Sequence, residues 1–97
     1  MNKKIMILRL KECQCILKEI YNKNLGAPGC VLEANYFIKF AQYTLEDEYT
    51  KTIAIEAEHL LSVAKRFDEF GVYGFKFFVS DLIDAIQGRI AFEADLI

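Results

Sequence analysis

The hydrophobic residues of this chain recur at helical spacing in four segments, which short polar or glycine-containing stretches separate. The longest pattern lies between Thr44 and Gly71. Its apolar positions alternate steps of four and three residues, which places them on one side of a helix. They are Ile53, Ala57, Leu60, Ala64 and Phe67. Thr44 with Asp47 fits a capping box, and Gly71 is typical of a helix end, so we predict a helix over residues 45–70.

Two further helices are predicted ahead of this one. Residues 3–24 carry apolar residues at helical spacing, and Lys4, Lys11 and Lys18 form a separate basic stripe on the same segment. The sequence Ala27-Pro28-Gly29 is typical of a turn. After it, residues 31–43 have few polar positions, so this helix is either central or covered on two sides.

A fourth helix is predicted over residues 75–96, after the reversal indicated by Gly71 and Gly74, and a kink near Gly88 is compatible with the pattern. Two short stretches leave a strand as an alternative. Residues 5–8 are apolar at every position, and residues 72–79 are rich in β-forming side chains. The expected fold is an all-α, four-helix, up-and-down antiparallel bundle forming a single domain over residues 1–97.

Composition favours a packed helical domain with apolar residues to spare. The 97 residues are 54% hydrophobic and include eight Phe and five Tyr but one Pro. A chain of this length has a small core, so surplus apolar residues are expected at a partner or self-association surface.

Charge is unevenly divided along the chain, although its formal net value is only −2. Residues 1–30 contain six Lys or Arg and two acidic residues, whereas residues 31–97 contain six and twelve. This balance disfavours direct nucleic-acid binding, which needs a net basic surface, and favours a basic protein partner.

No export signal or membrane-spanning stretch is apparent in the sequence, and its three cysteines are an odd number. We therefore expect reduced thiols, a cytoplasmic location and no membrane partner.

Few residues suggest chemistry. Glu56 and His59 form a Glu-x-x-His pair, the spacing used by ferritin-like carboxylate-bridged metal sites. Such a site needs more ligands than one pair, and a homodimer could supply a second pair. The alternative is that Glu56 and His59 are solvated surface residues. Cys13 and Cys15 are two residues apart and so point to different sides of a helix. Asp81 and Asp84 are interpreted as helix surface. We expect neither enzymatic activity nor a cofactor.

Two function classes follow. The first is a non-catalytic protein-binding module, an inhibitor or immunity-type protein that neutralises a toxin, nuclease or defence protein through an acidic and aromatic face. The second is a homo-oligomeric, metal-binding or structural helical protein, a homodimer being the simplest case. The residues expected to bind the partner are Glu46, Asp47, Glu48, Glu56 and Glu58 as charges, and Tyr36, Tyr43, Tyr49 and Tyr73 as aromatic anchors. For each tyrosine the alternative is packing in the core.

Overall fold

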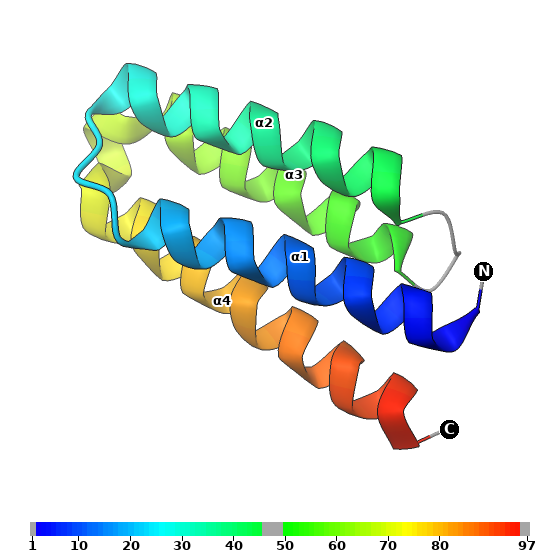
Figure 1. Ribbon diagram of the computed structural model, residues 1–97. Coiled ribbons are helices and arrows are strands. Elements are labelled where there is room, and N and C mark those ends of the chain that lie inside the picture. The colour runs from blue at the N-terminus through cyan, green and yellow to red at the C-terminus, as the bar shows by residue number, and fades with distance from the viewer. Residues whose placement is uncertain (1, 46–49, 96–97) are drawn as a thin grey trace.

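The computed structural model describes residues 2–45 and 50–95, and these form four α-helices and no strand. The helices are α1 (Lys3–Tyr21), α2 (Ala27–Thr44), α3 (Lys51–Lys65) and α4 (Phe67–Asp95). Consecutive helices run in opposite directions, as Figure 1 shows. The predicted four-helix antiparallel bundle is therefore confirmed, and the strand alternatives for residues 5–8 and 72–79 are excluded, since both stretches are helical.

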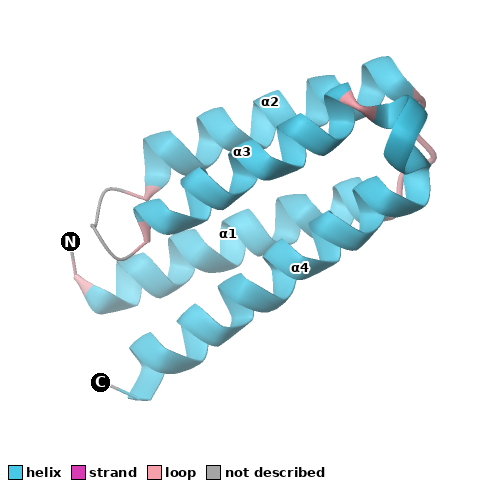
Figure 2. Ribbon diagram, turned by 180° about the vertical axis from the view of Figure 1, so that it is seen from behind, coloured by secondary structure: helices cyan, strands magenta, loops and turns pink. Residues whose placement is uncertain are grey.

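The bundle consists of two closely packed helix pairs. α1 packs most extensively against α4, and α2 against α3, while α3 and α4 join the pairs. α1 and α2 share a smaller interface. Figures 1 and 2 show the α2–α3 pair lying over the α1–α4 pair from both sides. None of the helices in the described ranges has an apolar stretch long enough to cross a membrane.

α1 is initiated by Asn2. Its side-chain oxygen accepts hydrogen bonds from the backbone N–H groups of Lys4 at 2.7 Å and Ile5 at 3.3 Å, which are donors that a helix start leaves unsatisfied. The buried side of the helix consists of Met6, Leu10, Cys13, Gln14, Leu17 and Ile20. The helix ends three residues earlier than predicted, at Tyr21.

α2 begins four residues before the predicted position, so the interpretation of Ala27-Pro28-Gly29 as a turn is wrong. Proline is accepted in the first helical turn because its missing N–H would have no partner there. At the other end, the Thr44 hydroxyl donates to the backbone carbonyl of Phe40 at 2.8 Å. Thr44 is therefore the last residue of α2 and does not cap the helix that follows.

The helix predicted over residues 45–70 is shorter in the structure. Leu45 has an extended backbone conformation, and α3 begins only at Lys51, after Thr50 at the N-cap position. The other half of the predicted capping box, Asp47, lies outside the described residues. α3 ends at Lys65, because the backbone of Arg66 leaves helical geometry.

Gly71 makes the bend that the sequence predicted, but within α4 and not at the end of α3. Its backbone angles are φ 68° and ψ −178°, which side chains with a Cβ rarely adopt. One helical turn precedes it, and the long segment that packs along α1 and α3 follows. Gly88 is helical and produces no kink, because the backbone between Gly71 and Asp95 stays regular.

Polar side chains fasten α1 to α4 in addition to apolar packing. Gln14 donates through Nε2 to Gln87 Oε1 at 2.9 Å and to the backbone carbonyl of Ile83 at 3.3 Å. At the other end of the pair, Lys3 Nζ and Arg89 Nη2 contact the carboxylate of Glu93 at 3.0 and 2.9 Å. These contacts fix the register of α4 against α1, and with it the face that α4 presents to α3.

Candidate functional site

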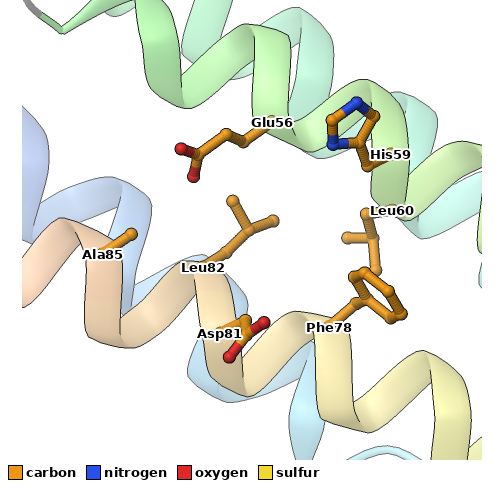
Figure 3. Close-up of a pocket in the computed structure, with 7 residues that line it drawn as sticks. All are labelled: Glu56, His59, Leu60, Phe78, Asp81, Leu82 and Ala85. Carbon is orange, nitrogen blue, oxygen red and sulfur yellow. The ribbon is translucent and has the colours of Figure 1, made fainter.

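A groove of about 370 Å³ lies between α3 and α4. Glu56 and His59 are three residues apart and share one side of α3, and Asp81 is on the facing side of α4 (Figure 3). The complete lining is Glu56, His59 and Leu60 from α3, with Phe78, Asp81, Leu82 and Ala85 from α4.

The groove combines an apolar floor with an acidic rim. Leu60 and Leu82 are buried, while Glu56 and Asp81 are exposed on the two opposite walls. No lysine or arginine lines the groove, and neither carboxylate forms an ion pair with any residue in the described ranges. Such an arrangement suits a positively charged group carried on an apolar stem.

The Glu-x-x-His pair alone does not form a metal site. Within residues 2–45 and 50–95, no group of three or more His, Cys, Asp or Glu side chains could hold a metal ion. Asp81 lines the same groove as Glu56 and His59 but does not complete a ligand set. The metal-binding alternative would therefore need ligands beyond these residues.

The outer side of α2 carries a line of exposed apolar residues. Leu32, Tyr36 and Tyr43 are separated by four and seven residues, so they project in nearly the same direction from the helix. Their exposed fractions are 70%, 56% and 87%. Lys39 is the exposed charged residue in the same line, and the Tyr36 ring stacks on that of Phe40 with centroids 6.5 Å apart. α2 packs against α3 and less extensively against α1, but its outer side, with these three residues, has no covering from the described part of the chain.

The expected partner-binding residues do not gather in one patch. Glu56 lies in the α3–α4 groove, whereas Glu58 is exposed on α3 outside it. Tyr73 is 85% exposed near the start of α4. Tyr36 and Tyr43 lie on α2, away from that groove. The remaining four, Glu46, Asp47, Glu48 and Tyr49, lie outside the described residues.

A second groove, of about 490 Å³, lies between α1 and α2 where these helices share their smaller interface. Its apolar lining includes Ile16 and Tyr36, and an ion pair of 3.0 Å joins Lys23, in the connection after α1, to Glu33 of α2. Lys23 and Glu33 neutralise each other, and Glu19 is the remaining charged residue in the lining. Unlike the α3–α4 groove, this one therefore has a lysine among its lining residues.

Cys13 and Cys15 point to different sides of α1, as their spacing predicted, and the three cysteines differ in burial. Cys13 and Cys30 are buried and Cys15 is exposed. Burial raises the pKa of the Cys13 thiol from 9.0 to about 11, partly offset by its contact with the Thr44 hydroxyl at 3.9 Å. Burial also raises the pKa of Cys30. Both groups are therefore held as neutral thiols, the less nucleophilic form.

Asp81 is the residue that sequence analysis assigned to plain helix surface and that the structure places in the groove. Asp84 does not line it, although the two acids are three residues apart. Asp81 and Glu56 line the same groove because of how α4 is aligned against α3. The sequence of neither helix alone predicts that alignment. Phe78 and Leu82 fall within the helix predicted over residues 75–96, and their place in the groove depends on the same alignment.

Comparison of the chain with protein-family models, with curated proteins and with solved structures finds no match.

Proposed function

We propose that this protein is a non-catalytic protein-binding module that recognises a basic partner and neutralises it by direct binding, in the manner of an inhibitor or immunity protein. The target class is a toxin, nuclease or defence protein with a basic surface. The observation that carries the proposal is the exposed line of Leu32, Tyr36 and Tyr43 on α2.

Tyrosine side chains offer a large contact area together with a hydroxyl group, and they are enriched among the residues that dominate binding energy. Eleven large hydrophobic side chains within the described ranges are at least a third exposed. Scattered single residues of this kind are ordinary, but Leu32, Tyr36 and Tyr43 lie on one side of the same helix, interrupted by Lys39, and form a largely apolar strip. This supports a surface that another protein covers.

Charge supports the basic character of the partner. Residues 31–97 contain twice as many acidic as basic residues, and Glu56, Glu58, Asp81 and Asp84 are exposed on α3 and α4. An acidic surface attracts a basic partner before contact and accelerates association, particularly at low salt.

The test is capture of partners from native lysate with the tagged protein, comparing wild type with the double variant Tyr36→Ser, Tyr43→Ser. We expect one stoichiometric basic partner whose affinity for the double variant falls at least about tenfold. Phe77→Ser is the matched control, because it removes an exposed aromatic side chain from α4 instead. An equal loss of partner capture in the double variant and in the control would contradict binding through α2.

Neutralisation is tested with the purified partner. Adding this protein at a molar ratio of one should abolish the partner's activity, and the variant with both tyrosines replaced should need a higher concentration. Light scattering of the protein alone provides the counter-test. A defined oligomer whose contacts bury Tyr36 and Tyr43, with no partner captured, would favour the self-associating class instead.

A further inference from the structure

We propose that the α3–α4 groove is the receptor site for an arginine side chain of the basic partner, with Glu56 and Asp81 as its charge-recognising residues. This proposal rests on the proposed function and specifies the chemistry by which one part of the partner is held. It concerns a surface separate from the tyrosines of α2.

The two carboxylates are positioned on different helices. Glu56 comes from α3 and Asp81 from α4, so a ligand between them meets negative charge from both sides (Figure 3). A guanidinium group has five N–H donors spread over a plane and can donate to two carboxylates at once. An ammonium group carries its charge at one point and lacks this planar geometry.

The floor of the groove matches the rest of an arginine side chain. Leu60, Leu82 and Ala85 provide apolar contacts for the three methylene groups, and the Phe78 ring is a surface for the guanidinium plane. The same pairing of guanidinium and phenyl ring occurs elsewhere in this chain, with Arg66 at 5.0 Å from the Phe70 ring centre and Arg89 at 4.7 Å from that of Phe92. An acidic rim without this floor would attract any cation.

The chain itself does not satisfy these carboxylates. The ion pairs in the described residues use other acids, namely Glu12, Glu33, Glu69 and Glu93. Arginine in the groove would therefore not have to displace an internal cation. Charge complementarity thus favours a cationic occupant over a neutral or anionic one.

The test is an NMR titration of ¹⁵N-labelled protein with the blocked tripeptide Gly-Arg-Gly and with the same peptide carrying citrulline, the uncharged analogue of arginine. We expect amide shifts centred on residues 56–60 and 78–85 with the arginine peptide. Binding of the citrulline peptide should be weaker by about fivefold or more, because its urea group carries no charge for the carboxylates to pair with.

Two double variants separate the groove from general acidity. Glu56→Gln, Asp81→Asn removes the rim charges, and Glu58→Gln, Asp84→Asn removes the same number of charges from the same two helices outside the groove. The first should weaken arginine-peptide binding about fivefold or more, and the second less than about twofold. Since none of these four acids forms an ion pair within the described residues, both variants should remain folded.

Equal losses in the two variants, or shifts distributed over all acidic surfaces, would overturn the groove as an arginine site. Equal binding of the citrulline peptide would overturn it as well. Neither result affects the proposed function, which is tested separately by partner capture with wild type and the Tyr36 and Tyr43 double variant. Conversely, failure to capture a partner would leave the groove's preference for arginine measurable by itself.

Discussion

Glu93 and Lys3 are 90 positions apart in the sequence, and their side chains meet at 3.0 Å. The Glu93 residue is only 3% exposed, and Arg89 contacts its second carboxylate oxygen at 2.9 Å. A buried carboxylate with two cationic partners is compensated for the hydration that it loses on folding. This contact joins the beginning of α1 to the end of α4.

Replacing Glu93 by Gln should destabilise the protein by about 1–3 kcal/mol. The buried carboxylate would be lost, and with it the shared ion-pair partner of Lys3 and Arg89. Chemical denaturation measures this change. Glu12→Gln is the control, since the Arg9–Glu12 pair is exposed on both sides and its loss should cost less than about 0.5 kcal/mol. Equal effects from the two variants would show that burial of Glu93 contributes nothing.

Gly71→Ala should cost about 1–3 kcal/mol, because the positive φ of 68° combined with an extended ψ is nearly inaccessible to alanine. Gly88→Ala should have the opposite sign and stabilise by about 0.5–1 kcal/mol, since Gly88 is helical and an added Cβ would meet no atom within 4 Å. Thermal melting of both variants checks the pair of signs. A Gly71→Ala protein as stable as wild type would contradict the backbone geometry at the bend.

The three cysteines should react with a thiol reagent in two phases. Cys15 is exposed and should react at once, whereas Cys13 and Cys30 are buried and should wait for the fold to open. Titration of native protein should therefore give one fast thiol per chain, and denatured protein should give all three. In Cys15→Ser the fast phase should disappear. Two fast thiols in the native wild type would show that a buried cysteine is accessible.

Stability should decrease as pH rises from 9 toward 11. Burial raises the pKa of Cys13 from 9.0 to about 11, so in this interval the folded chain keeps a proton that the unfolded chain has lost. The unfolded state is favoured accordingly, by about 2–3 kcal/mol at the end of the interval. Denaturation at a series of pH values should show a larger loss in Cys15→Ser than in Cys13→Ala, in which only the raised pKa of buried Cys30 still contributes. An identical pH dependence in both variants would contradict the assignment to Cys13.

The periodicity of the sequence was sufficient to predict the bundle, because each helix buries one regular stripe, as Leu10 and Leu17 do in α1 and Leu60 does in α3. Helix ends were harder to predict. Threonine and proline occur both within helices and at their ends, so the residue types of Thr44 and Pro28 alone do not locate a helix boundary. Thr44 is the last residue of α2 and its hydroxyl donates to the carbonyl of Phe40. From the sequence, a threonine at this point could equally have capped the next helix.

For the candidate surfaces, sequence alone identified residue types but not their grouping. Glu56 and His59 share a helix side by spacing, so their proximity was predictable. The position of Asp81 opposite them depends on the packing of α4 against its neighbours, which distant contacts such as Gln14 with Gln87 help to set. Whether Tyr36 faces the core or the solvent likewise depended on which side of α2 its neighbours occupy.

The pairing of the first helix with the last has a consequence for the order of folding. α2 and α3 are close in sequence, so they can associate soon after both have been synthesised. α1 must wait for α4, and closing so long a loop carries a larger entropic cost. On the ribosome, the apolar side of α1, including Leu10 and Leu17, would lack its main covering until α4 has emerged, because α1 shares only a smaller interface with α2. A chaperone or a nascent partner would encounter that side first.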